Sequence, residues 1–512
     1  MTFPILTVLA LLPAIGAVSL IFIRGPLAKQ IALVDSLLVL LVAVILAVRF
    51  QAGGGMQFVE QVHWIKPLGA YYALGLDGIG LTLVLLVSIV TPVVVLASWR
   101  DFDAKRRPGE LAPKYGSHVF FALVLAVETC ALFLFLATDV FLFYVFFEVI
   151  LVPMYFLIGG FGPGPRRTYA AAKFLIFGLL GGFVMLASVI GLYVLSAQAG
   201  AASYLLSTLS SLPMGTGTGR WLFLGFLFAF AIKAPLVPLH TWLPDAAEES
   251  TPGGAVMMVG VMDKIGTFGM IRFCLGLFPE ASRWATPVVL VLAVISILYG
   301  AILAVGSRDL MRFIAYTSIS HFGFIVLGIF AFTSQSLVGS TLYMLNHGLS
   351  TAALFVMAGY LIRRRGSRAI SDYTGVDQVA PVLAGLLLFA GLSTLSLPGL
   401  SSFVSEFMVL AGTFSRHPAY AVVSTLAIVL AALYILLAYQ RTMTGPVRPS
   451  VEPMKDLSRR ERLAMAPLVF LIVLLGFFPK PLLTVIEPAV QSAMQHVGVT
   501  DPQPRVSAGG NR

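Results

Sequence analysis

The 512 residues of the chain are strongly apolar: 58% are hydrophobic, only 11% are charged, and the mean hydropathy is +0.94. Soluble domains carry about 25% charged residues, so this composition excludes a water-soluble enzyme. The net charge of +10 would suggest nucleic-acid binding in a soluble chain. In a membrane chain, the distribution of basic residues first indicates how the membrane spans are oriented.

Apolar runs long enough to span a bilayer, which takes about 20 residues, follow one another along the whole chain. The fourteen runs are approximately 3–23, 29–49, 78–98, 117–136, 140–160, 170–196, 221–243, 253–278, 287–305, 309–331, 336–361, 382–412, 419–441 and 464–486. The first run lacks a basic n-region and a small-residue cleavage site, so we expect a retained helix rather than a signal peptide. The expected fold class is an all-α integral membrane protein with about 14 transmembrane helices.

The basic residues predict how these spans are oriented. Most Lys and Arg residues fall in one set of alternate loops, among them Arg100, Lys114, Arg312, Arg364 and Arg460. The positive-inside rule places these loops in the cytoplasm, and both termini are then expected on the outer side.

Ionisable residues inside the apolar runs recur at a regular spacing. Glu148 and His321 are 173 residues apart, as are Lys233 and Glu406, and Lys173 and His347 are 174 apart. The pattern predicts two copies of a five-helix unit. Because five is an odd number, the second copy must run in the opposite direction, as in the inverted repeats of ion-coupled transporters.

The repeat predicts how the chain is divided. We expect an N-terminal part of three helices (1–116), a first five-helix repeat (117–278), a second, inverted repeat (287–441) and a C-terminal part with the last helix (442–512). The chain shows no sign of a separate soluble domain.

The seventh and twelfth runs contain proline next to an ionisable residue. In AIKAPLVPLHTWLP, Pro235 and Pro238 follow Lys233, and in STLSLPGLSSFVSEF, Pro398 precedes Glu406. Proline removes a backbone donor and clashes with the preceding turn. We therefore expect helices 7 and 12 to be broken at mid-membrane, as in transporters; the alternative is a simple kink in a packed helix.

Six ionisable residues lie too deep in their runs to reach the membrane surface. These candidate proton-relay residues are Glu148, Lys233, Lys264, His321, His347 and Glu406. A charge at the bilayer centre costs about 2.5–3.5 kcal/mol on insertion scales, so such groups face the protein interior. Their similar depths predict a polar line parallel to the membrane, along which protons could move.

Each of these residues also has a structural interpretation. Glu148 and Lys233 could form a static pair, and His321 and His347 could be ordinary core histidines or ligands of a b-type haem. Asp263 points about 100° around its helix from Lys264, so it pairs elsewhere or tunes the site from behind. Three weaker candidates, expected to be helix-packing or boundary groups, are Asp35, Glu128 and His240.

Signals for bound cofactors and metals are missing from the sequence. There is no GxxxxGK[ST] loop and no dinucleotide fingerprint, so the chain is expected to bind neither ATP nor NADH. Cys130 and Cys274 lie far apart in apolar runs without metal-ligand spacing, so both are expected to be inert and buried. The energy for transport must come from an ion gradient or from a partner.

Several of these segments are similar to those of a known family. They are FLFYVFFEVILVPMYFLIGGFG, FAIKAPLVPLHTWLPDA, DKIGTFGMIRF, IAYTSISHFGFIVLGIF, LYMLNHGLSTAALF and SLPGLSSFVSEFMVL. Over about residues 70–480 the chain strongly resembles the antiporter-like membrane subunits of respiratory complex I, the NADH-quinone oxidoreductase. Glutamate at position 406 and the short tail after the last run resemble the M-type members more than the L- and N-type members.

The resemblance implies proton translocation driven at a distance by quinone reduction in neighbouring subunits. It implies these roles: Glu148 and Lys233 as partners on helices 5 and 7, Lys264 as central relay lysine, His321 and His347 as links, and Glu406 as the helix-12 residue. Asp263 replaces a residue that is usually apolar in this family.

The resemblance also implies a location and partners. The chain is expected in the bacterial plasma membrane, in contact with the lipid bilayer and with other complex I subunits, especially L- and N-type neighbours, and not with nucleic acid. FMN, Fe–S clusters and quinone are expected in partner subunits, so this chain would belong to an enzyme without carrying a redox centre or a metal.

Two other functions remain open on the sequence. One is a subunit of a multisubunit Na⁺/H⁺ antiporter or of a membrane-bound hydrogenase, both built on related helices. The other is a structural membrane scaffold whose charges hold helices together. A sodium pathway favours clustered carboxylate and carbonyl oxygens, whereas a line of Lys and His favours protons.

Overall fold

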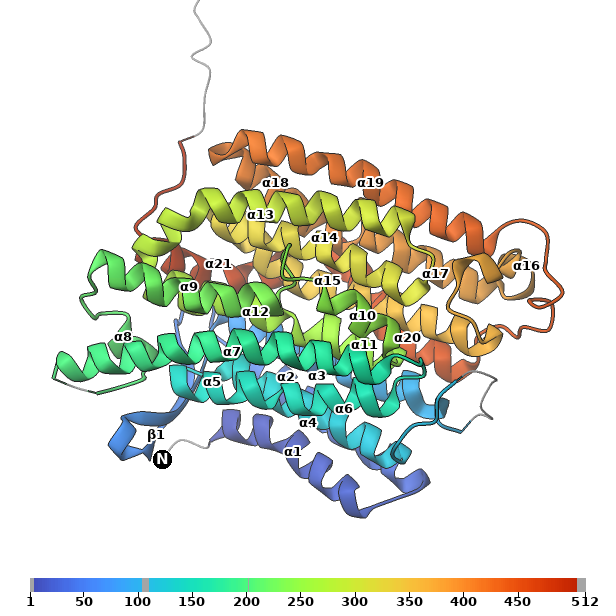
Figure 1. Cartoon of the computed structure of the whole chain (residues 1–512), viewed down its shortest axis with the longest axis horizontal. Helices are drawn as coiled ribbons and strands as arrows, with labels where there is room; N and C mark the ends of the chain where they lie inside the picture. Colours follow the sequence, from blue (N-terminus) through green and yellow to red (C-terminus); the bar gives the residue numbers. More distant parts are fainter. Residues whose placement is uncertain (1–3, 104–109, 201, 504–512) are drawn as a thin grey trace, which may run out of the picture.

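The computed structural model describes residues 4–103, 110–200 and 202–503, which form an almost entirely helical protein. Figure 1 shows the long helices side by side, from α1 (Ile5–Phe22) at one edge to α19 (Pro418–Met443) at the other. Within the described ranges, eleven helices are long and apolar enough to span a membrane, and one bent pair would make a twelfth. The chain is a mostly helical membrane protein.

The N-terminal part holds long helices and one small sheet. Its elements are α1, α2 (Pro26–Arg49), β1 (Gln57–Ile65), the 3₁₀ turn η1 (Lys66–Leu68), β2 (Ala70–Leu76), α3 (Gly78–Ala97) and the 3₁₀ turn η2 (Ser98–Arg100). The two strands pair antiparallel, with Val62 opposite Tyr72. The hairpin was not predicted. The Glu60 carboxylate accepts from the Leu6 amide at 2.7 Å and so ties the hairpin to α1.

The next elements cover the predicted first repeat. They are α4 (Ser117–Leu136), α5 (Val140–Val149), α6 (Leu151–Phe161), α7 (Arg167–Gln198), α8 (Leu206–Leu209), α9 (Thr216–Lys233), α10 (Trp242–Glu249), α11 (Pro252–Ala255), the π-helix η3 (Val256–Met262), α12 (Lys264–Gly269) and the π-helix η4 (Met270–Leu275). Two π-helical stretches therefore interrupt the eighth predicted span, which the sequence pattern did not reveal.

The remaining elements cover the predicted second repeat and the C-terminal part. They are α13 (Pro279–Gly306), α14 (Leu310–Phe330), α15 (Ser334–Arg365), the 3₁₀ turn η5 (Ile370–Asp372), α16 (Val376–Val379), α17 (Pro381–Thr394), α18 (Ser401–Arg416), α19, α20 (Arg459–Phe477) and α21 (Lys480–Val497). The central helix is α15, which packs against α3, α14, α17, α18, α20 and α21.

Besides the fifth span, which is divided at Ile150 into α5 and α6, and the eighth span with its π-helices, three predicted spans are not single long helices. The run 221–243 is split where α9 ends at Lys233, and 382–412 is split between α17 and α18, as the prolines indicated. The prediction of one helix over 464–486 is wrong. The chain bends by 72° between α20 and α21, because Pro479 cannot continue the hydrogen-bond ladder, and α21 then stays helical to Val497.

The burial pattern separates an inner core from an outer apolar surface. Almost the whole of α14 and α15 is buried, although both carry many polar residues. Large apolar side chains are exposed on the peripheral helices instead, for example Phe22 at 79% and Val48 at 81%. Exposed apolar faces around a polar-containing core are typical of a protein whose solvent is lipid.

Candidate functional site

The end of α9 places Lys233 inside the protein. Pro235 and Pro238 follow Lys233 at once, and the indole of Trp242 donates to the Ile232 carbonyl at 3.0 Å, so the break leaves that carbonyl satisfied. Lys233 is only 2% exposed. Its Nζ lies 3.4 Å from the Phe147 carbonyl and 4.3 Å from the centre of the Phe147 ring.

The carboxylate of Glu148 lies near Lys233 but is not bound to it. The two charges attract one another, yet neither carboxylate oxygen of Glu148 has a hydrogen-bond partner among the described residues. The side chain occupies the space left by the missing side chain of Gly182 on α7, where a Cβ would collide with Oε1. The predicted pair is thus a pair of neighbours, and a small movement would bring them into contact.

Lys264 follows the π-helix η3 and is fully buried. Its Nζ donates to the Val259 carbonyl at 2.7 Å, lies 2.8 Å from Nδ1 of His347, and sits 4.9 Å from the centre of the Phe322 ring. Single π-helical turns are frequent at functional sites. Here the π-helix precedes the residue that contacts the second half of the chain.

From His347 the line continues through side chains in contact. The rings of His347 and His321 have centroids 5.4 Å apart. Nδ1 of His321 lies 2.7 Å from the Tyr343 hydroxyl, which donates to Oε2 of Glu406 at 2.7 Å.

Tyr343 is a member of this line that sequence reasoning missed. It precedes His347 by four residues on α15, and residues four apart share one face of a helix. That spacing was the available signal, but a tyrosine in an apolar run is usually read as an ordinary core residue. Its ring is fully buried. Among the described residues, its hydroxyl is the only group that links His321 to Glu406 through hydrogen bonds.

Glu406 also receives a hydrogen bond from a residue in the break between α17 and α18. Ser396 lies in this break with a left-handed φ of 61°, and its hydroxyl donates to Oε2 of Glu406 at 2.6 Å. Asn346 of α15 donates to the Ser401 carbonyl at 2.7 Å, which satisfies a backbone group at the start of α18. Both helix breaks therefore lie beside one of the predicted residues, with polar side chains replacing lost backbone hydrogen bonds.

Lys173 does not belong to this line, although its spacing matched that of His347. Its Nζ donates to the Asp245 carboxylate at 2.6 Å, and Arg312 donates to the other oxygen of Asp245 at 2.8 Å. Arg312 also pairs with Glu248. These ion pairs join α7, α10 and α14 at the end of the bundle that carries the predicted cytoplasmic loops.

The weaker candidates lie elsewhere. Asp35 and Glu128 are buried on α2 and α4, and the ring of His240 packs on Tyr299 at 5.3 Å. Cys130 and Cys274 are buried and free. Within the described ranges, no group of three or more His, Cys, Asp or Glu residues is arranged to hold a metal ion.

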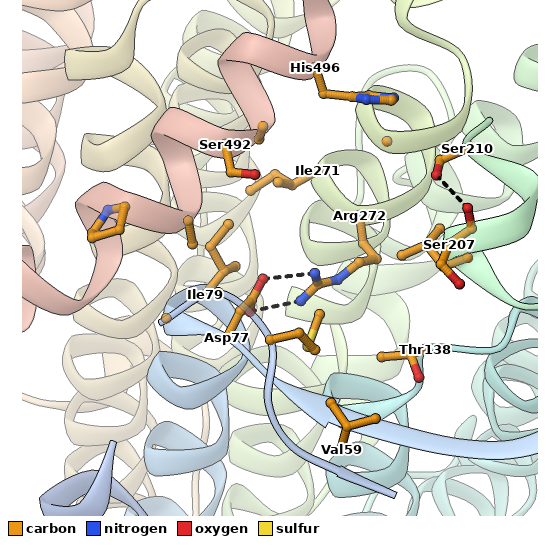
Figure 2. A pocket seen from close by; sticks show the side chains of 18 of the residues that line it. Val59, Asp77, Ile79, Thr138, Ser207, Ser210, Ile271, Arg272, Ser492 and His496 are labelled. Atoms are coloured by element: carbon orange, nitrogen blue, oxygen red, sulfur yellow. Dashed lines mark hydrogen bonds and ion pairs between the residues drawn. The ribbon is translucent and has the colours of Figure 1, made fainter. Parts of the chain in front are cut away.

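A recess of about 680 Å³ opens at the opposite end of the bundle, between the β-hairpin, η4 and α21. Figure 2 shows Asp77 and Arg272 facing one another in it through two contacts, of 2.8 and 2.7 Å. Burial acts to raise the pKa of Asp77, but Arg272 and the Gly80 amide outweigh it, so the pKa lies below its usual value. One wall of the recess therefore carries an ion pair in which Asp77 remains ionised at neutral pH.

Broken helices beside a buried line of Glu, Lys and His define an antiporter-like membrane protein, and comparison with known proteins agrees. Residues 137–431 match the family model described as NADH:quinone oxidoreductase/Mrp antiporter, transmembrane. NADH-quinone oxidoreductase subunit M of Mycobacterium tuberculosis is 50% identical, over 98% of this chain and 96% of that protein. The chain belongs to the family of NADH-quinone oxidoreductase M subunits.

Solved structures share this architecture. A chain of respiratory complex I from Thermus thermophilus with bound NADH is 31% identical, with a TM-score of 0.87, over 96% of this chain and 100% of that one. A chain of the Mrp complex from Dietzia sp. DQ12-45-1b is 23% identical, with a TM-score of 0.82, over 97% and 100%. The latter similarity shows a shared fold alone.

Proposed function

We propose that the chain is a proton-translocating subunit of the membrane arm of respiratory complex I. Protons pass along Glu148, Lys233, Lys264, His347, His321 and Glu406, driven by quinone reduction in other subunits. The observation that carries the proposal is the unbroken contact line from Lys264 through His347, His321 and Tyr343 to Glu406. Amine, imidazole, hydroxyl and carboxyl groups can each gain and lose a proton, so such a line suits proton transfer.

A static scaffold would use these groups differently. Buried charges that only hold helices together are expected in direct, fully hydrogen-bonded pairs. Glu148 lacks any hydrogen-bond partner in the described structure, and Nε2 is unpartnered in both His321 and His347. Free donor and acceptor positions favour groups that change partners during a cycle over groups that stay paired.

The proposal includes a finer topology. Counting α9 with α10 and α17 with α18 as broken spans, and α20 as the last crossing, yields the fourteen spans expected from the sequence. Residues 117–278 and 287–441 are then the two inverted units, with 1–116 before them and 442–512 after them. Both termini lie on the outer side of a bacterial plasma membrane; residues 1–3 and 504–512, at the very ends, are outside the described structure.

The proposed partners follow from the family. Neighbouring L- and N-type subunits would lie against this chain in the membrane, and FMN, Fe–S clusters and quinone would reside in other subunits. The relatedness to Mrp antiporters leaves a sodium–proton antiporter subunit as the competing function. Copurification of the chain with flavin and Fe–S subunits would support complex I, and its recovery with other antiporter subunits alone would contradict the proposal.

The relay is tested by Lys233→Ala and Glu148→Ala in the intact complex. Membrane vesicles are supplied with NADH, and proton uptake and NADH oxidation are followed together. We expect assembled complexes with a strong loss of proton uptake. If either variant assembles and builds a normal proton gradient during quinone reduction, the relay role of that residue is wrong.

A further inference from the structure

A fully buried carboxylate, that of Asp263, interacts electrostatically with both relay lysines and belongs to no ion pair among the described residues. Asp263 has no exposed surface, and neither of its carboxylate oxygens has a hydrogen-bond partner in the described chain. It is attracted by both Lys233 and Lys264. No salt bridge of 4.0 Å or less joins it to either lysine in the described chain, so the attraction to both acts without a direct contact.

The helix geometry makes Asp263 and Lys264 face different neighbours. Asp263 is the junction between the π-helix η3 and α12, and adjacent helical residues point about 100° apart. Lys264 points to α15, where it meets His347 at 2.8 Å. Asp263 consequently points away from that contact.

The direction of Asp263 follows from the packing of Gly266. Residues three apart lie on the same face of a helix, so Gly266 marks the face that carries Asp263. A Cβ on Gly266 would lie 2.6 Å from the Ala234 amide nitrogen and 2.6 Å from the Phe230 carbonyl oxygen. This face therefore touches the end of α9, where Lys233 is located.

The connection between the two halves of the relay is otherwise incomplete. Lys264, His347, His321, Tyr343 and Glu406 are in continuous contact, but the nearest polar partner of Lys233 is the Phe147 carbonyl at 3.4 Å. A backbone carbonyl does not hold a transferable proton at neutral pH. Among the described residues, the one ionisable side chain that interacts electrostatically with both lysines is Asp263.

We propose that Asp263 is a relay residue that carries the proton between Lys233 and Lys264. This inference rests on the proposed function and adds a member to its pathway. In the first step an N–H bond of the Lys233 ammonium breaks and an O–H bond forms on the Asp263 carboxylate. In the second step that O–H bond breaks and an N–H bond forms on the neutral amine of Lys264, so atoms and charge balance, and the reverse order applies to the opposite direction.

The test compares Asp263→Asn with Asp263→Glu in the assembled complex. Asparagine keeps the size and polarity of the side chain but cannot take up the proton, whereas glutamate keeps the carboxyl group. A positioned group that transfers a proton contributes about 10²–10⁴-fold. We expect Asp263→Asn to slow NADH-driven proton uptake by roughly tenfold or more, and Asp263→Glu to restore much of it.

Two controls separate this inference from the proposed function. Asp35→Asn removes another buried carboxylate, on which neither lysine acts electrostatically, and it is expected to pump normally. NADH oxidation with ferricyanide reports whether the partner subunits remain intact. If Lys233→Ala abolishes pumping while Asp263→Asn pumps like the parent, this inference alone fails; if Lys233→Ala pumps normally, the proposed function fails first.

A spectroscopic measurement keeps the inference testable if Asp263→Asn does not assemble. Complex labelled with ¹³C at the aspartate carboxyl is driven by NADH, and infrared difference spectra record carboxyl groups that change protonation. We expect a labelled aspartate signal in the parent that is lost in Asp263→Glu. Identical labelled signals in the two proteins would overturn the assignment.

Discussion

His321 and Glu406 are joined through one hydroxyl group, that of Tyr343. The hydroxyl donates its hydrogen to Oε2 of Glu406, so the Tyr343 oxygen acts as the acceptor towards His321. Nδ1 of His321 must therefore carry the hydrogen in its contact with the Tyr343 oxygen. Nε2 of His321 is then the basic nitrogen, and it has no hydrogen-bond partner in the described structure. The three groups form a chain in which a proton arriving at the histidine can leave from the carboxyl.

Tyr343→Phe tests this link, because phenylalanine keeps the buried ring and removes only the hydroxyl. We expect the complex to assemble and the rate of NADH-driven proton uptake in vesicles to fall by roughly tenfold or more. Tyr360→Phe is the matched control. Tyr360 is also buried on α15, and its hydroxyl has no hydrogen-bond partner there, so equal effects of the two substitutions would argue against the link.

Lys264→Arg tests whether Lys264 must release its proton. Arginine keeps the positive charge near His347 but is effectively always protonated and presents a larger, planar group. We expect roughly a tenfold or larger loss of proton uptake, even though the charge is retained. Full pumping by Lys264→Arg would show that a fixed charge is sufficient at this position.

Gly182→Ala tests the position of the Glu148 carboxylate. The added methyl group would collide with Oε1 of Glu148 and force the side chain to move. Small displacements of reacting groups are costly, so we expect proton uptake to slow by roughly tenfold. Gly191→Ala on the same helix meets only the end of the Leu222 side chain at 2.5 Å, which can move, and near-parental pumping is expected there.

Asp139 provides a prediction of pH dependence outside the spans. Burial raises its pKa to about 6, although hydrogen bonds from the amides of Leu142 and Tyr71 oppose this. A raised folded-state pKa contributes stability that is full below the unfolded value of 3.8 and is lost as the pH rises through about 6.

Asp139→Asn cannot ionise and therefore lacks this pH dependence. The stability of the variant relative to the parent should rise between pH 4 and 7, by up to roughly 3 kcal/mol, and stay constant above that range. Thermal unfolding of the purified proteins in detergent at several pH values measures the difference. A difference that is constant with pH, or that changes in the opposite direction, would be inconsistent with a raised pKa.

Many features of the candidate site could be predicted before the structure. Proline next to Lys233 and before Glu406 predicted both helix breaks, because proline cannot extend a helix wherever the chain packs. The depth of the six ionisable residues in apolar runs predicted that they face the interior, since lipid cannot solvate charge. These are local or composition-level constraints, and they hold without knowledge of neighbouring helices.

Other features depend on which side chains meet across helices. Lys173 and His347 had matching sequence positions, but Lys173 pairs with Asp245. The four-residue spacing places Tyr343 on the same helix face as His347, but this spacing alone does not separate it from a core aromatic residue. The β-hairpin escaped prediction because strand formation depends on cross-strand packing more than on intrinsic preference.

Apolar length and composition establish that the chain is a membrane protein with only a few charges inside its apolar runs, because length and the cost of buried charge are properties of each segment. The tertiary structure decided the order of contacts: Lys264 against His347, Tyr343 between His321 and Glu406, and Asp263 on the face that meets the end of α9. Proton transfer requires donors and acceptors within hydrogen-bond reach, directly or through one water, and only the packing of helices distant in the chain brings these groups near one another.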